Sequence, residues 1–110
     1  MADHARLQEP TFLILAALDQ PRHGYGILQQ VQGLSAGRVR LRPGTLYAAL
    51  DRLVADGLVE ESGQEVVGGR LRRYYRLTEH GERMLAAEID VWKANVRAAT
   101  RSLRRVAAEG

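Results

Sequence analysis

Residues 40–78 read RLRPGTLYAALDRLVADGLVEESGQEVVGGRLRRYYRLT, and the hydrophobic period changes along this stretch from helical to alternating. The first part predicts a helix that begins at Pro43, because a proline suits the first helical turn, where its missing N–H is not needed. Gly57 is expected to follow the end of this helix in a left-handed conformation. Apolar residues at helical spacing predict the face that packs inward: Leu46, Leu50, Leu53 and Val54.

Two short strands are predicted after this helix, over Leu58–Glu61 and Arg73–Leu77. Side chains alternate along a strand, so one of the two adjacent tyrosines, Tyr74 and Tyr75, is expected to point inward. The connection between the strands contains three glycines, and three arginines follow it: Gly63, Gly68 and Gly69, then Arg70, Arg72 and Arg73.

A helix followed by a basic hairpin is the order in which a winged helix-turn-helix offers a helix to the major groove of DNA and a hairpin to the backbone or the minor groove. The first turn, Pro43–Thr45, aims free N–H groups at a phosphate. Short residues on the outer face, among them Ala48 and Ala49, let the helix approach another surface closely. The predicted DNA contacts are Tyr25, Arg42, Pro43, Gly44, Thr45, Tyr47, Ala48, Arg52, Arg70, Arg72 and Arg73.

Other interpretations of the same residues stay open. The helix that begins at Pro43 could be an ordinary amphipathic helix with a plain outer face. The hairpin could be a solvated one whose charges discourage pairing with another strand. The arm that faces the arginines also carries carboxylates, which could pair with them: Glu60, Glu61 and Glu65.

Two further helices are predicted in the N-terminal third of the chain. The first covers Thr11–Asp19 and ends before Pro21. It is apolar nearly all round, so it should be buried on more than one side. Residues 23–26 have turn chemistry, and the second helix then runs over about residues 27–34. Residues 38–41 alternate polar and apolar, which indicates either a weak strand or an extended lead-in.

A fourth helix is predicted from Glu79 to about Ala107, a length of about 40 Å. Thr78 is a suitable N-cap, whereas Gly81 stands where a capping box would have Glu or Gln. Apolar residues recur in steps of four and three, which is the repeat of a coiled coil. A small body cannot bury so long a seam, so the sequence predicts a homodimer about a two-fold axis. The predicted dimer interface is Leu85, Ile89, Trp92, Val96, Ala99, Leu103 and Val106.

Trp92 is the sole tryptophan, and it lies on this seam. It could be a flat aromatic wall that stacks on a planar ligand, or a large residue that closes the dimer. Arginines near the end of the helix are explained by the favourable interaction of cations with a helix C-terminus: Arg97, Arg101, Arg104 and Arg105.

The composition fits one domain with an extension, since the chain has 110 residues of which 45% are hydrophobic. The formal net charge is only +3, so the placement of the charges is more informative than their sum. Lys93 is the only lysine, and the other fifteen basic residues are arginines. This bias reflects either recognition of phosphates and guanine or a GC-rich genome.

Several classes of function find no support in the sequence. The lack of cysteine excludes disulfides, thiolate metal sites and cysteine nucleophiles. His4, His23 and His80 are scattered without metal-ligand spacing, and no catalytic or nucleotide-binding motif is present. The N-terminus does not resemble a signal peptide, and the apolar run at residues 12–18 is too short to cross a bilayer. We therefore expect a cytoplasmic protein that is not an enzyme and needs no metal or cofactor.

Three motifs in the same order resemble the PadR family of transcriptional regulators: HGYGI at 23–27, RPGTLYAALDRLVADGLV at 42–59, and GGRLRRYYRLTEHG at 68–81. The resemblance covers about residues 7–92 and is closest to the short subclass with one C-terminal helix. It implies a mainly α fold with a small β-hairpin. A winged helix-turn-helix domain would cover residues 1–77 and a dimerisation helix residues 78–110.

The resemblance also implies the role of the dimer centre. Several short members resemble multidrug sensors, with a hydrophobic pore flanked by a tryptophan from each C-terminal helix. Trp92 falls on that tryptophan and Phe12 on a pore-lining position, and Glu88 and Val96 complete the predicted effector-binding set. Many members have a small capping residue where this chain has Arg42. Arginine cannot accept a hydrogen bond from the first-turn amides, so Arg42 is expected to point at a phosphate.

The predicted function is that of a DNA-binding regulator, a repressor that binds a pseudo-palindromic operator as a homodimer. Its half-sites should be about one helical turn, or a multiple of it, apart. A small planar or apolar ligand at the dimer centre is expected to change its grip on double-stranded DNA. Two alternatives remain: a winged-helix module that binds another protein, and a dimer that sequesters a ligand without acting through DNA.

Overall fold

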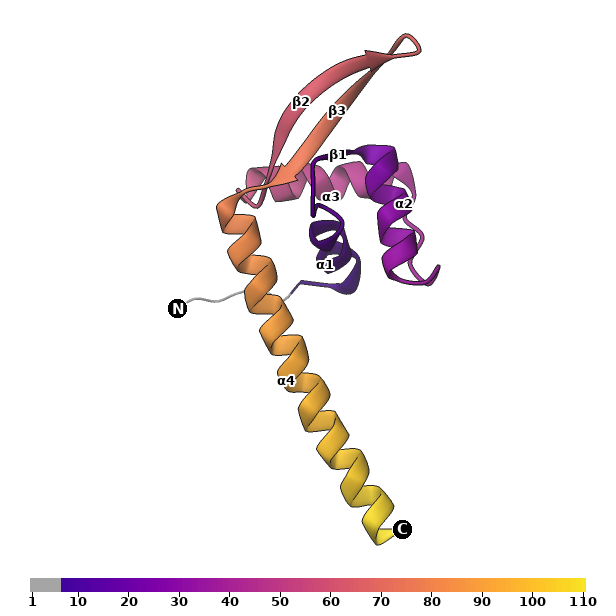
Figure 1. Ribbon diagram of the computed structural model, residues 1–110, viewed down its shortest axis with the longest axis vertical. Helices are drawn as coiled ribbons and strands as arrows, with labels where there is room; N and C mark the ends of the chain where they lie inside the picture. The colour runs from indigo at the N-terminus through magenta and orange to yellow at the C-terminus, as the bar shows by residue number, and fades with distance from the viewer. Residues whose placement is uncertain (1–6) are drawn as a thin grey trace.

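A small winged-helix body carries one long helix that extends away from it, as Figure 1 shows. The computed structural model describes residues 7–110. Within this range the predicted fold class is confirmed, with four helices and one antiparallel sheet of three strands. The elements in chain order are α1 (Glu9–Ala16), β1 (Arg22–His23), α2 (Gly24–Leu34), α3 (Pro43–Ala55), β2 (Val59–Val67), β3 (Arg70–Leu77) and α4 (Glu79–Glu109).

The hydrophobic core lies where α1, α2 and α3 meet the base of the sheet. α1 runs over residues 9–16 instead of the expected 11–19. Pro10 occupies its first turn, and the helix ends early because the backbone tightens: the Ala17 N–H donates to Ile14 as well as to Leu13. The apolar surface of α1 is shared between the core and α4, which explains why the helix lacks a polar face.

Residues 22–26 differ from the prediction. The expected turn at 23–26 is instead the start of α2, which begins at Gly24. His23 is its N-cap, because its Nδ1 accepts a hydrogen bond of 3.2 Å from the Gly26 N–H. Arg22 and His23 also form β1, which pairs with Tyr75 and Tyr74 of β3. A strand of two residues has too little sequence to show alternation, so the pattern did not predict it.

α3 begins at Pro43 as predicted, and Gly57 follows it with a φ of 77°. Two assignments to its faces were wrong. Val54, expected inward, is 43% exposed, and Ala49, expected on the outer face, is 6% exposed. The buried face is rotated toward Ala49 because α3 packs against both α2 and β2. Residues 38–41 form no strand and are the extended lead-in to α3.

The hairpin is longer than the two predicted strands, since β2 and β3 together run over residues 59–77 with a turn of two residues. Gly68 and Gly69 both have positive φ, at 59° and 78°, which is the conformation of a tight type I′ turn. Gly63 was expected in the connection but lies within β2, beside a register shift at residues 61–63. Arg70 and Arg72 accordingly lie on β3, together with Arg73, which was predicted on the strand.

α4 has 31 residues, and its start is anchored to the connection between α3 and β2. Thr78 caps the helix as predicted, with its Oγ1 accepting from the Gly81 N–H at 3.0 Å and donating to Gly57 at 2.6 Å. A side chain at Gly81 would collide with the carbonyl oxygen of Leu58, which explains why a capping box is absent. In the part of the chain that the structure describes, no helix is long and apolar enough to cross a membrane.

Candidate DNA-binding surface

The outer face of α3 is open to solvent at most of the positions predicted to contact DNA. Tyr47 is 44% exposed, and the side chains at Thr45, Ala48 and Arg52 are also exposed. Arg42 is the N-cap residue and makes no capping hydrogen bond through its side chain. The N–H groups of the first turn of α3 therefore have no side-chain acceptor at the cap and can donate to an anion.

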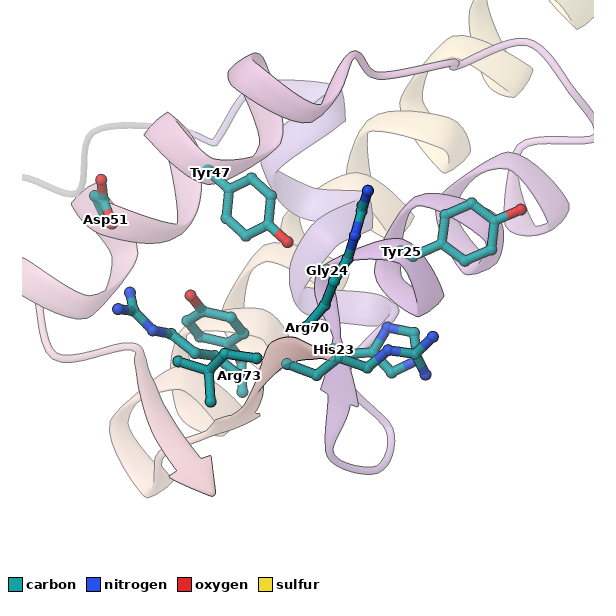
Figure 2. A pocket seen from close by; sticks show the side chains of 10 residues that line it. His23, Gly24, Tyr25, Tyr47, Asp51, Arg70 and Arg73 are labelled. Atoms are coloured by element: carbon teal, nitrogen blue, oxygen red, sulfur yellow. The ribbon is translucent and has the colours of Figure 1, made fainter. Parts of the chain in front are cut away.

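A crevice of about 690 Å³ separates α3 from the hairpin. Its floor is the start of α2, where the absence of a side chain at Gly24 lets Tyr47 pack over the helix. Figure 2 shows Tyr25 and Tyr47 on the two sides of Gly24, with the side chain of Arg70 extended between them. The structure thus brings together residues from three predicted groups: the first turn of α2, the outer face of α3 and the arginines of β3.

The charges of the hairpin are partly paired within it. Arg76 binds Glu60 on the facing strand at 2.6 Å, and Arg73 Nε lies 3.6 Å from Glu61 Oε2. Among residues 7–110, by contrast, neither Arg70 nor Arg72 is paired with a carboxylate. The three arginines that the sequence offers as one basic patch therefore differ in their partners.

The two adjacent tyrosines of β3 are confirmed to face opposite ways. Tyr75 is 6% exposed, and burial raises the pKa of its hydroxyl. Tyr74 donates a hydrogen bond of 2.5 Å to Glu65 across the hairpin, and this bond raises the pKa of Tyr74 because it stabilises the protonated phenol. The Tyr74 ring also meets His23 edge to face, with the ring centroids 5.4 Å apart. Tyr74 thereby connects the hairpin to the cap of α2.

A second, apolar groove lies between α1 and α4, with a volume of about 380 Å³. Phe12 and Trp92 are in contact there, with ring centroids 6.5 Å apart and Trp92 43% exposed. Val96 also lines the groove, whereas Glu88 is buried one turn before Trp92 and is not among the lining side chains. Sequence reasoning did not include three other lining residues: Ile89 as a ligand contact, Lys93 and Arg97.

Beyond this groove the seam of α4 is open to solvent. Leu85 and Ile89 are half-buried against the body. Farther along, the exposed fraction is 61% at Val96, 70% at Leu103 and 67% at Val106. The predicted apolar seam therefore lies on one continuous helix, but no other part of the described chain covers the second half of that seam.

Two functional features of the DNA-facing side were not found from the sequence. The role of His23 as a cap could have been recognised, because it precedes a helix and can accept a hydrogen bond from an N–H two or three residues later. The second feature is Asp51, which lines the crevice. Its helical spacing from Tyr47 was available in the sequence, but the hairpin that it faces is placed only by tertiary packing.

Comparison with known proteins gives consistent results. A family model described as the transcriptional regulator PadR-like family matches residues 13–87. The transcriptional regulator Rv3488 of Mycobacterium tuberculosis is 46% identical over 72 residues, and this match spans 66% of the chain but less than two thirds of that relative, 64%. The crystal structure of a PadR family regulator from Clostridium difficile superposes with a TM-score of 0.73 at 25% identity, covering 87% of this chain and 99% of the other.

Bacillus subtilis PadR, solved in complex with operator DNA, has the same fold at 19% identity, with a TM-score of 0.66 over 74% of this chain and 47% of the other. Members of the matched family are regulators of transcription, which confirms the expectation that this protein is not an enzyme. The winged-helix body, the long terminal helix and the match over residues 13–87 lead to one conclusion: the chain belongs to the PadR-like family of transcriptional regulators.

Proposed function

We propose that this protein binds duplex DNA with α3 in the major groove and the β2–β3 hairpin against the adjacent backbone. The observation that carries the proposal is the convergence of Tyr25, Tyr47, Arg70 and Arg72 on one open crevice beside the free first turn of α3. Backbone amides, hydroxyls and guanidinium groups without a carboxylate partner are the donors that bind phosphate oxygens. Bacillus subtilis PadR, which shares the fold, was solved with operator DNA.

The DNA-bound form is a homodimer joined along α4. The exposed seam of Val96, Ala99, Leu103 and Val106 supports this, because a monomer would leave a row of apolar side chains in water. Two copies about a two-fold axis would bury the row and hold two α3 helices for two half-sites. A pseudo-palindromic operator with half-sites about one helical turn apart, or a multiple of it, matches that symmetry. Repression then follows directly, because a dimer on the operator excludes the polymerase from the same DNA.

The groove of Phe12, Trp92 and Val96 is the proposed effector site. Its aromatic pair and apolar lining suit a small planar ligand, and it lies on the surface that the dimer would enclose. A ligand there would alter DNA binding only by favouring one relative arrangement of the two subunits over another. The groove connects ligand binding to the proposed dimer, because α4 lines the groove and also carries the dimer seam.

DNA binding is tested by titrating the protein against a mixed-sequence duplex of about 30 base pairs, three helical turns, over a series of salt concentrations. The logarithm of the affinity should fall linearly with the logarithm of the salt concentration, because bound arginines release counterions from phosphates. Ala48→Glu places a carboxylate on the outer face of α3 and should weaken binding at least about tenfold. Ala94→Glu, on an exposed position of α4 away from the seam, is the matched control and should bind like the native protein.

Selection from a random duplex pool then gives the operator, and recovered sequences should contain an inverted repeat. Binding that does not depend on salt, or an equal effect of the two glutamate substitutions, would contradict the proposal. In that case the outer face of α3 would be a surface for another protein.

A further inference from the structure

Arg73 differs from the other two arginines in the face of the hairpin on which it lies. Side chains alternate along β3, so Arg73 shares a face with the buried Tyr75, and Arg72 shares the other face with Tyr74. Tyr75 is buried and lies near Tyr47 and Asp51, so its face turns toward α3, although Arg70 and Arg72 on the other face also line the crevice. On the facing strand, Glu61 pairs directly with Tyr75 in register, and its carboxylate reaches Arg73 Nε at 3.6 Å.

A second carboxylate reaches the same place from α3. Asp51 follows Tyr47 by four residues, so the two side chains lie on one face of the helix, and both line the crevice. In Figure 2 the guanidinium group of Arg73 lies on the Asp51 side of the crevice. Arg73, Glu61 and Asp51 all influence the pKa of the Tyr75 hydroxyl, so Asp51 lies in the neighbourhood of the Arg73–Glu61 pair, but only Glu61 is within ion-pair distance of Arg73. Arg73 thus pairs with one carboxylate, Glu61 on β2, and shares the crevice lining with a second, Asp51 on α3.

These carboxylates stand where a DNA reader would be expected to avoid negative charge. Asp51 is exposed on α3 and Glu61 on β2, both beside the surface proposed to meet phosphates. Left unpaired, each would repel the DNA backbone, and this repulsion would grow as water leaves the interface. A cation held between them cancels the repulsion and also bridges α3 and the hairpin. A guanidinium group suits this role, because its fork offers donors in several directions.

We propose that Arg73 is a positioning residue, an internal counterion that joins Asp51 on α3 to Glu61 on β2 and sets the hairpin against the recognition helix, whereas Arg70 and Arg72 bind the phosphates. This inference rests on the proposed DNA binding. It separates residues that the sequence presented as equivalent phosphate contacts. Phosphate affinity then depends on the two arginines that lack a carboxylate partner among residues 7–110.

The number of phosphate contacts can be counted from the salt dependence of binding to the mixed-sequence duplex. Arg72→Gln should reduce the slope of log affinity against log salt by about one, the value for loss of one phosphate contact. Arg73→Gln should leave the slope unchanged and weaken binding by less than about fivefold, as expected for loss of an exposed ion pair. Both arginines are exposed, so neither substitution removes core packing.

A double-mutant cycle tests whether the two carboxylates keep Arg73 away from the DNA, with the slope of log affinity against log salt as the measured quantity. Replacing both carboxylates, by Asp51→Asn with Glu61→Gln, should release Arg73 to the DNA and raise the slope by about one. The same pair of changes in the Arg73→Gln background should not raise it, but should restore affinity to within about twofold of the native protein. Circular dichroism and thermal unfolding confirm that each variant is folded.

Different results would contradict the proposed DNA binding and the proposed role of Arg73. A native protein that shows no salt-dependent affinity for the duplex would overturn the proposed DNA binding itself. A native protein that binds normally, with Arg73→Gln and Arg72→Gln lowering the slope equally, would overturn only the role of Arg73. So would a carboxylate pair whose replacement raises the slope by the same amount whether or not Arg73 is present.

Discussion

Tyr74 and Tyr75 show how neighbouring residues of one type acquire different roles. Tyr75 closes the core beneath the hairpin, and Tyr74 holds Glu65 across the strands and contacts the cap of α2. Alternation along the strand predicts that they differ, but which one faces inward depends on which face of the hairpin meets α3. The same alternation divides Arg72 from Arg73, so the chemistry of each arginine follows from its position and not from its type.

The proposed effector groove can be tested at a single residue, Trp92. Trp92→Ala should remove the flat wall of the groove and abolish the fluorescence gain of an apolar dye, anilinonaphthalene sulfonate, bound there. Affinity for duplex DNA should stay within about twofold, because the groove lies away from α3 and the hairpin. Dye titration and DNA titration on the same preparations check this. If the variant instead became monomeric, Trp92 would be a residue that closes the dimer.

The first turn of α4 is the joint on which the long helix depends. Thr78 binds both the end of α3, through Gly57, and the helix N-terminus, through Gly81. The backbone of Leu58 approaches this turn so closely that a glycine is required at position 81. The orientation of α4, and hence of any dimer built on it, is therefore set by backbone contacts at the base of the hairpin.

A pair of glycine substitutions tests this joint. Gly81→Ala should lower the free energy of unfolding by about 1–3 kcal/mol, because the new methyl group would displace α4 from the Leu58 carbonyl. Gly33→Ala, within α2, has open space around it and should raise the free energy of unfolding by up to about 1 kcal/mol through better helix propensity. Urea denaturation measures both. Opposite signs are expected, and a stabilising Gly81→Ala would show that the close approach can relax.

The molecule as a whole is elongated, with principal extents of 64 × 35 × 21 Å, because α4 continues well past the body (Figure 1). The body covers the start of the seam at Leu85 and Ile89 and leaves Leu103 and Val106 in water. An exposed helix of such amphipathic character is stabilised mainly by packing, so a second copy would supply what this chain lacks. The division of the chain at residues 77 and 78 into a DNA-binding part and a dimerisation part stays a prediction.

Leu103→Asp tests the dimer. Leu103 is 70% exposed in the single chain, so the substitution removes little packing there, but about a two-fold axis it would place two carboxylates in the apolar seam. Sedimentation equilibrium should show a dimer for the native protein, and the apparent molar mass of the variant should fall toward that of one chain. Ala94→Asp lies on the opposite side of α4 and should remain dimeric. A native protein that is monomeric at micromolar concentration would contradict the proposed homodimer, which holds two α3 helices for two half-sites.

The sequence by itself determined the order and type of the main elements, because hydrophobic period, Pro43, Gly57 and Thr78 act over a few neighbouring residues. It also predicted a set of residues for contact with DNA, because residue type and helical spacing are local properties. Only the tertiary structure decided that Ala49 and not Val54 packs inward, that residues 22–23 form a strand, and that Arg73 lies 3.6 Å from Glu61. Each of these depends on how α3 and the hairpin pack against elements far away in the chain, and packing between distant segments leaves no period in the sequence to read.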